Sequence, residues 1–247
     1  GALVRSGGPG QQEEGLGGLV DADLGLANLD VLLGINVHSD LSHVLAGTRK
    51  LDDVVIDLSC GVQLVPGASG LANLAHLSEF QRAQLLAELT ALEADNDTII
   101  VDCGAGIGPD VLHFAAGADN ALVVTTPEPT AITDAYAVVK VLSQRSYKGH
   151  LSVLINQATD RGEGRQTYRR IADVAWQFLR RAVFDGGYIV TDPKLPLAVR
   201  QRQPFVLAYP RCPAAKCLAG LARKLGGSRT FLNESEGFFR RVAKWFA

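Results

Sequence analysis

Three aspartates stand at points where the chain could carry out metal or phosphate chemistry. Asp21 and Asp23 follow a short apolar run and are separated by one residue. Asp102 ends a longer apolar run and precedes Gly104 and Gly106. Carboxylates at the ends of buried strands can bind a metal ion and orient a reacting water, and glycines beside them let the backbone approach a phosphate. This pattern of residues favours metal-assisted transfer of a phosphoryl group.

A purely structural role explains the same residues when each is taken singly. An aspartate beside a glycine at the end of a strand commonly forms a turn or caps the next helix. Asn156, which closes another apolar run, also suits a polar turn. Both interpretations therefore stay open for Asp21, Asp102 and Asn156 until the surrounding sequence is considered.

Apolar runs alternate with amphipathic segments between residues 19 and 225. Short apolar runs bounded by turn residues predict buried strands, and apolar residues at helical spacing predict helices. This alternation indicates an α/β fold with a doubly wound, mostly parallel sheet, in which ligands bind at the carboxyl ends of the strands. The predicted strands are 19–20, 54–56, 62–65, 98–102, 122–127, 151–156 and 188–190, and the main predicted helices are 78–95, 133–143, 165–183 and 213–225.

The overall composition excludes several classes of protein. The chain has 247 residues, of which 47% are hydrophobic and 20% are charged, as in ordinary globular proteins. Its net charge of −2 gives no reason to expect nucleic-acid binding. No apolar run is long enough for a transmembrane helix, and the start lacks a signal-peptide pattern. The four cysteines form no C-x-x-C pair, which argues against a metal cluster and favours a reducing cytosol.

Residues 1–18 have a different character from the rest. They contain seven glycines and show no apolar periodicity, which predicts loop or disorder. The chain also begins with Gly1 and contains no methionine, so we expect its native start to lie outside this sequence. We interpret 1–18 as a degenerate or truncated N-terminal segment.

Four ordered segments share their motifs with a known protein family. The string from Asp21 to Asp30 resembles the first switch region of MinD/ParA-type ATPases. The string from Asp102 to Gly106 resembles their second switch motif, D-[ST]-x-A-G, with cysteine in its second position. Segments 65–70 and 126–136 resemble the FlhG/FleN branch, which controls flagellar number and placement. The chain therefore resembles a MinD/ParA-type ATPase closest to FlhG/FleN over most of residues 19–225.

This resemblance implies ATP and Mg²⁺ as cofactors and gives each site residue a role. Asp102 would hold Mg²⁺, Asp21 would assist the metal shell, and Asp23 would orient the attacking water. We therefore expect metal-assisted hydrolysis of ATP to ADP and phosphate. The residues expected to contact the nucleotide are Gly106 at the γ-phosphate and Asn156 and Asp192 at the adenine base.

The phosphate-binding loop of the family is the part that this sequence does not match. The family carries K-G-G-x-G-K-[ST] before a long helix, whereas only Arg5 to Gly10 is similar here and the first lysine is Lys50. The amides and lysines of that loop hold the β- and γ-phosphates. We therefore predict poor ATP binding by this sequence. Two functions stay open: an ATPase, or a pseudo-ATPase scaffold that binds partners and membrane without hydrolysis.

The C-terminal residues form a separate amphipathic segment. Residues 226–233 predict a linker, and residues 234–247 predict a helix with its apolar side chains on one side and basic side chains on the other. MinD-type proteins end in such a membrane-targeting helix, whereas the alternative is a helix docked on the domain's own core. The residues predicted to contact a membrane are Phe238, Phe239, Arg240, Arg241, Val242, Lys244, Trp245 and Phe246.

The resemblance also implies partners and a location. We expect a homodimer in the ATP-bound state and an anionic membrane surface as a binding partner. A protein partner of the FlhF or MinC/MinE kind fits the same family. The expected location is cytoplasmic and peripheral, on the inner face of the cell membrane, and nucleic acid is not an expected partner.

Overall fold

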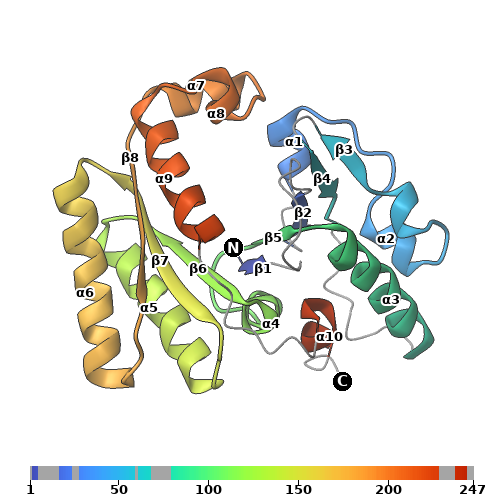
Figure 1. The fold of residues 1–247 in the computed structure, drawn as a ribbon, viewed down its shortest axis with the longest axis horizontal. Helices are drawn as coiled ribbons and strands as arrows, with labels where there is room; N and C mark the ends of the chain where they lie inside the picture. Colours follow the sequence, from blue (N-terminus) through green and yellow to red (C-terminus); the bar gives the residue numbers. More distant parts are fainter. Residues whose placement is uncertain are drawn as a thin grey trace. The chain divides into compact units, whose positions relative to one another are not determined.

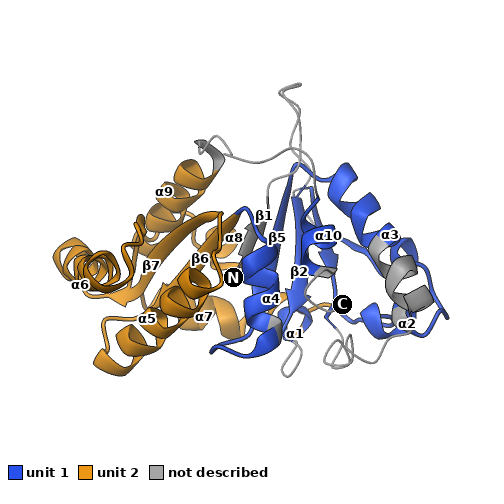
Figure 2. Cartoon of the chain, turned by 90° about the horizontal axis from the view of Figure 1, so that it is seen from below, with its two compact units in different colours: residues 1–30, 36–119, 231–247 blue, residues 31–35, 120–230 orange. Residues whose placement is uncertain are grey.

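A computed structural model describes residues 2–4, 17–23, 28–58, 61–67, 79–227 and 237–243 of the chain. These residues alternate between strands and helices, so the predicted α/β fold is confirmed (Figure 1). The chain divides into two compact units, which Figure 2 colours separately. Unit 1 comprises residues 1–30, 36–119 and 231–247, and unit 2 comprises residues 31–35 and 120–230.

The sheet of unit 1 is built around two parallel central strands. β2 (Gly17–Ala22) lies between β4 (Val62–Val65) and β5 (Thr98–Cys103) and runs parallel to both. β3 (Ile56–Leu58) pairs with β4 in antiparallel direction. Parallel strands end at the same edge of a sheet, so the carboxyl ends of β2, β4 and β5 bring their following residues together.

The N-terminal segment differs from its prediction as loop or disorder. Ala2–Val4 forms a short strand, β1, which pairs antiparallel with β5, and β2 begins at Gly17. Leu3 pairs with Ile100 of β5 in this register. A three-residue apolar run is too short to show strand periodicity in the sequence, and pairing with a neighbouring strand decides its conformation.

The helices of unit 1 start at residues suited to the position. Asp40 caps α2 (Leu41–Leu45), since its Oδ1 accepts the backbone N–H of Ser42 at 2.9 Å. α4 (Pro109–Gly117), which the sequence analysis did not identify, has proline in its first turn, where no N–H partner is needed. The other described helices of unit 1 are the 3₁₀ helix η1 (Leu51–Asp53), α3 (Glu79–Asp95) and α10 (Phe238–Ala243). α1 (Leu29–Leu33) has its first two residues in unit 1 and its last three in unit 2.

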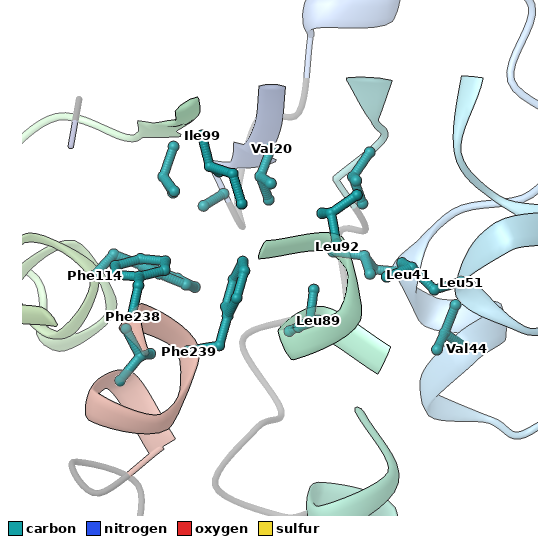
Figure 3. Close-up of a cluster of buried hydrophobic side chains, with 14 of the residues drawn as sticks. Val20, Leu41, Val44, Leu51, Leu89, Leu92, Ile99, Phe114, Phe238 and Phe239 are labelled. Carbon is teal, nitrogen blue, oxygen red and sulfur yellow. The ribbon is translucent and has the colours of Figure 1, made fainter. Parts of the chain in front are cut away.

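The core of unit 1 includes side chains from the C-terminal helix. Phe238 and Phe239 of α10 are 0% and 2% exposed and pack with Val20, Ile99 and Phe114 (Figure 3). Val242 is buried in the same cluster. The structure therefore differs from the predicted membrane-facing arrangement of these three side chains and has the docked alternative.

Unit 2 contains three parallel strands covered by helices. β6 (Asn120–Thr125), β7 (His150–Ala158) and β8 (Phe184–Val190) pair in that order. α6 begins at Arg161, four residues before its predicted start, because Asp160 Oδ1 accepts the Glu163 N–H at 2.9 Å. The helices of unit 2 are α5 (Pro129–Gln144), α6 (Arg161–Leu179), α7 (Lys194–Arg200), α8 (Phe205–Ala208) and α9 (Pro213–Gly227).

Within the described residues, no helix is both long and apolar enough to cross a bilayer.

Candidate functional site

Two of the predicted site residues lie opposite each other in the sheet of unit 1. Asp21 of β2 is the register partner of Asp102 of β5, at the carboxyl ends of the two parallel strands. Asp21 is only 3% exposed, and Asp102 is partly buried. Asp23 follows β2 directly and is also partly buried. The structure thus brings Asp21, Asp23 and Asp102 to one edge of the sheet.

The carboxylate of Asp21 is bound by the backbone that follows it. Its Oδ1 accepts the N–H of Asp23 at 3.1 Å. Its Oδ2 accepts the N–H groups of Asn28 and Leu29 at 3.2 and 3.3 Å. Asp21 therefore binds the backbone at the start of α1, as in the structural interpretation of the sequence.

The Asp102 carboxylate, in contrast, makes no hydrogen bond with the described residues. Burial raises the pKa of Asp102, and the negative charges of Asp21 and Asp23 raise it further. Burial also raises the pKa of Asp21, although its three backbone hydrogen bonds oppose this effect. Two buried carboxylates that repel each other are stabilised by a cation placed between or beside them. Asp102 is the carboxylate with free oxygens for such a cation.

The carboxylates of Asp102 and Asp21 suit a magnesium ion whose remaining ligands are water and substrate phosphates. Among the described residues, no group of three or more histidine, cysteine, aspartate or glutamate side chains is arranged to hold a metal ion. Mg²⁺ usually takes one or two carboxylates together with water and substrate phosphates. Asp102 with Asp21 matches that pattern and does not match a metal site made of protein ligands alone.

Two glycines leave room for the aspartates. A Cβ on Gly67, after β4, would lie 2.5 Å from the backbone oxygen of Asp21. A Cβ on Gly104 would lie 3.0 Å from Oδ1 of Asp23. Gly106 has a φ of +94°, which side-chain-bearing residues rarely adopt. Gly67, Gly104 and Gly106 therefore have a steric or conformational reason to be glycine.

The predicted base-contacting residues lie in unit 2. Asn156 lies inside β7, which continues to Ala158, and its Oδ1 accepts the N–H of Gln157 at 2.9 Å. Gln157 has a φ of +56°, at an irregularity in the pairing of β7 with β8. Asn156 thus stabilises a local distortion of the strand, which agrees with its interpretation as a polar turn residue.

Asp192 links the loop after β8 to the start of α9. Its Oδ1 accepts the N–H of Lys194 at 2.9 Å, and its Oδ2 accepts the N–H of Ala214 at 3.2 Å. The hydrogen bond from Lys194 is the main cause that lowers the pKa of this carboxyl. Because both oxygens accept backbone N–H groups, Asp192 supports the loop.

A pocket of about 550 Å³ lies beside Asp192, and it was not identified from the sequence. The ammonium group of Lys194 lies 5.1 Å from the ring centre of Tyr209, which is a cation–π distance. The proline-rich run from Tyr209 to Pro213 was the available signal, because it interrupts the helical pattern. The pocket is lined by Thr191, Asp192, Pro193, Lys194, Tyr209, Pro210, Arg211, Cys212 and Pro213.

The predicted membrane-contacting residues fall into four groups. Phe238, Phe239 and Val242 are buried, and Arg240 is exposed. Arg241 donates from Nε to the backbone oxygen of Gly117 at 2.8 Å and forms an ion pair with Asp119. Lys244, Trp245 and Phe246 lie outside the described residues.

The start of α10 is held by an acidic side chain of α3. Glu93 Oε1 accepts the N–H of Phe238 at 2.8 Å, and its other oxygen lies 3.5 Å from the N–H of Phe239. Together with the Arg241 contacts, this fixes both ends of the short helix in unit 1. The docking of α10 therefore combines buried aromatic rings with polar contacts at each end.

No protein-family model matches the chain. The antiactivator FleN of Pseudomonas aeruginosa is 38% identical over 207 residues, which cover 84% of this chain and 74% of FleN. The flagellum site-determining protein YlxH of Helicobacter pylori is 39% identical over 158 residues, covering 64% of this chain and 53% of YlxH. The septum site-determining protein MinD of Bacillus subtilis is 35% identical over 134 residues, or 51% of this chain and 47% of MinD.

Solved structures of MinD proteins share the fold. MinD of Pyrococcus horikoshii, solved in complex with Mg-ADP, has a TM-score of 0.69 at 24% identity and covers 87% of this chain and 84% of its own. The MinC:MinD complex of Aquifex aeolicus contains a chain with a TM-score of 0.69 at 25% identity, covering 89% of this chain and 87% of its own. A doubly wound α/β ATPase fold is thus common to these proteins.

Proposed function

Because the chain belongs to the MinD/ParA family of ATPases, close to its FlhG/FleN branch, we propose that it regulates the number or placement of flagella as an ATP-dependent, dimerising membrane switch. The similarity to FleN and to YlxH supports the flagellar role. The observation that best supports an ATPase site is the pairing of Asp21 with Asp102 at the carboxyl edge of the sheet.

In this proposal each residue at that edge of the sheet has a separate catalytic role. Asp102, assisted by Asp21, would hold Mg²⁺, which when bound would offset negative charge on the phosphates. Asp23 would orient the attacking water and accept its proton. The backbone N–H of Gly106 would donate a hydrogen bond to the γ-phosphate.

The pocket beside Asp192 suits the adenine base of the nucleotide. Asp192 would act on the base indirectly, by fixing the loop from Thr191 to Lys194 through its two backbone hydrogen bonds. Tyr209 would offer an aromatic face and Arg211 a planar cation to an aromatic ring. Asn156 keeps an amide nitrogen for the base, since its described hydrogen bond uses the oxygen.

A pseudo-ATPase scaffold is the second candidate, and a specific observation favours it. Residues 1–49 contain no lysine, so this segment carries neither lysine of the family's phosphate loop. Asp21 also has a structural role that it would keep without nucleotide. Such a scaffold would retain partner and membrane binding, with a partner of the FlhF or MinC/MinE kind.

Membrane binding requires α10 to leave the core of unit 1. The same faces of Phe238, Phe239 and Val242 cannot be buried in the protein and in a bilayer at once. We propose that the docked helix is the resting state and that release exposes it to an anionic surface, placing the protein peripherally on the inner membrane face. A homodimer would present two such helices, which strengthens binding through effective concentration.

Complementation tests the flagellar role directly. The chain carrying a restored phosphate loop, and the Asp102→Asn variant of that protein, are expressed in Pseudomonas aeruginosa lacking FleN, and flagella per cell are counted by electron microscopy. We expect the chain to shift the count toward that of the parent strain. Failure of the variant would support the ATPase, whereas equal activity of the variant would support the scaffold. A count equal to that of the empty vector would contradict both.

A further inference from the structure

The outer side of α6 carries a row of arginines around an exposed tryptophan. Trp176 is 57% exposed, and Arg165, Arg169 and Arg180 are exposed as well. At 100° per residue, positions 165, 169 and 176 fall within an arc of roughly 40°. Arg180 is the residue directly after α6, where it caps the helix with a φ of +50°. The buried residues of the helix, Gly164, Thr167, Ile171 and Ala175, lie on the other side. We call Arg165, Arg169, Trp176 and Arg180 the arginine face.

The charge of this face is not balanced by the described part of unit 2. None of its three arginines forms an ion pair with a described residue. Asp173 is the acidic side chain on the same side of the helix, while Glu163 is engaged by the N–H and hydroxyl of Thr159. The chain as a whole has a net charge of −2, so the face is a local concentration of positive charge.

The positions of the aromatic residues argue against a membrane as the ligand of this face. An interfacial helix needs its apolar side chains on one side and its cations on the other. Here Trp176 lies within the row of arginines, and the exposed Phe178 points about 200° away from it around the helix. A flat bilayer cannot receive both rings together.

The same arrangement suits a protein segment. Tryptophan and arginine are the residues most enriched at the energetic centres of protein interfaces. The helical part of the face, from Arg165 to Trp176, extends over about 16 Å, which is the length of three helical turns. Carboxylates spaced by one turn on a partner helix would lie opposite the arginines, with an apolar side chain against Trp176.

We infer that the arginine face binds an acidic amphipathic helix of a partner protein. The contact needs no nucleotide, and it does not involve α10. It is therefore independent of the flagellar and ATPase proposals. Complementary charge would steer the partner to the face, and the indole ring would supply the buried apolar contact.

A synthetic peptide provides the first test. The probe is a helical peptide with glutamates at one-turn intervals around a central leucine, and the control replaces every glutamate with lysine. Trp245→Phe leaves Trp176 as the one tryptophan of the chain. We expect the acidic peptide to shift Trp176 fluorescence to shorter wavelength in a saturable, salt-sensitive titration, and the lysine peptide to cause no shift.

Charge reversal assigns the contact to the face. Arg169→Glu with Arg180→Glu should weaken binding at least about tenfold, since like charges oppose each other at the contact. The matched control is Lys216→Glu with Arg223→Glu, an equal charge change on exposed positions of α9, which should change affinity less than about twofold. Circular dichroism verifies that both double variants are folded.

Three results would overturn the inference. The two peptides could bind alike, or the α9 variant could lose as much affinity as the α6 variant, which would indicate general electrostatic attraction. The third result is that phosphatidylglycerol vesicles, and not the acidic peptide, shift Trp176 fluorescence in an arginine-dependent way. In that case the face would be a lipid contact.

Discussion

Asp21 and Asp102 lie opposite each other on the parallel strands β2 and β5, and each is partly or fully buried. The two carboxylates differ in the hydrogen bonds that they accept. Asp21 accepts three backbone N–H groups, whereas Asp102 accepts none from the described residues. The Asp21 carboxylate thus binds the backbone at the start of α1, and we propose that the Asp102 carboxylate binds a cation. This division of roles has consequences for stability and for catalysis.

Removing the charge at position 102 should stabilise the protein at neutral pH. The folded-state pKa of Asp102 is raised above 3.8, so the folded state binds the proton more tightly than the unfolded state. Stability is therefore lost as pH rises through the folded-state pKa, and the penalty is present above it. We expect Asp102→Asn to raise the free energy of unfolding at pH 7.

Urea unfolding at several pH values measures this effect. The advantage of Asp102→Asn should shrink as the pH falls toward 3.8, where the wild-type side chain becomes protonated. Asp97→Asn, at an exposed position, is the control and should show no comparable gain. A destabilised Asp102→Asn variant at pH 7 would mean that the charged carboxylate has a stabilising partner.

Asp23 should matter for hydrolysis more than for binding. In a version of the protein with a restored phosphate loop, Asp23→Ala should reduce the hydrolysis rate by on the order of 10²-fold and leave ATP affinity nearly unchanged. A water-orienting group acts mainly in the transition state, which is the reason for this split. Steady-state phosphate release and nucleotide titration give the two quantities. Equal losses in both would assign Asp23 a structural role.

Gly67 should not tolerate a side chain. A Cβ there would lie 2.5 Å from the Asp21 backbone oxygen, so the strand end that carries the site must shift. We expect Gly67→Ala to cost about 1–3 kcal/mol of stability, as overpacking typically does. Gly17→Ala is the control, because a Cβ on Gly17 meets nothing within 4 Å. Thermal unfolding of the two variants is the measurement, and equal melting temperatures would contradict the close approach.

Loosening α10 should promote membrane binding. Glu93→Ala with Asp119→Ala removes the Glu93 hydrogen bonds at the start of the helix and the Asp119–Arg241 ion pair, and it leaves the Arg241–Gly117 hydrogen bond and the apolar residues in place. Charge-assisted hydrogen bonds contribute about 1.5–3 kcal/mol each, so the released population should rise severalfold or more. We expect more of the variant than of wild type to co-sediment with phosphatidylglycerol vesicles, and the exposed-site control Asp95→Ala to behave as wild type.

The contacts at a membrane can be separated from those in the core. Lys244 and Trp245 are predicted membrane residues that are not among the described contacts of the core. Adding Lys244→Glu and Trp245→Glu to the variant changed at Glu93 and Asp119 should therefore abolish its binding to vesicles. Unchanged vesicle binding of that combined protein would show that the C-terminal helix is not the anchor.

The sequence predicted the carboxyl ends of β2 and β5 well because the signal there is local. An apolar run that ends in an aspartate and a glycine is compatible with few structures other than a buried parallel strand and its turn. The pairing of Asp21 with Asp102 then follows from the rule that parallel strands end at one edge. The family resemblance was confirmed by the relatives for the same reason, since those motifs are continuous in the sequence.

The docking of α10 could not be predicted from periodicity. Phe238, Phe239 and Val242 form the same apolar pattern whether the helix covers a core or enters a bilayer. The contacts that decide between them come from Glu93 and Asp119, which are more than 100 residues away in the sequence. The early start of α6 was missed for a smaller reason, because glycine and polar residues follow Asp160 and hide the helical pattern.

Calorimetric titration with Mg-ATP tests the central claim most directly, which is that these residues form the metal and water side of an ATPase site without its phosphate-holding lysines. The titration uses the full chain at neutral pH, with Asp102→Asn and metal-free ATP as controls. We expect no saturable heat at micromolar nucleotide, because no lysine precedes Lys50 to hold the phosphates. A micromolar dissociation constant that is lost in Asp102→Asn would contradict this claim.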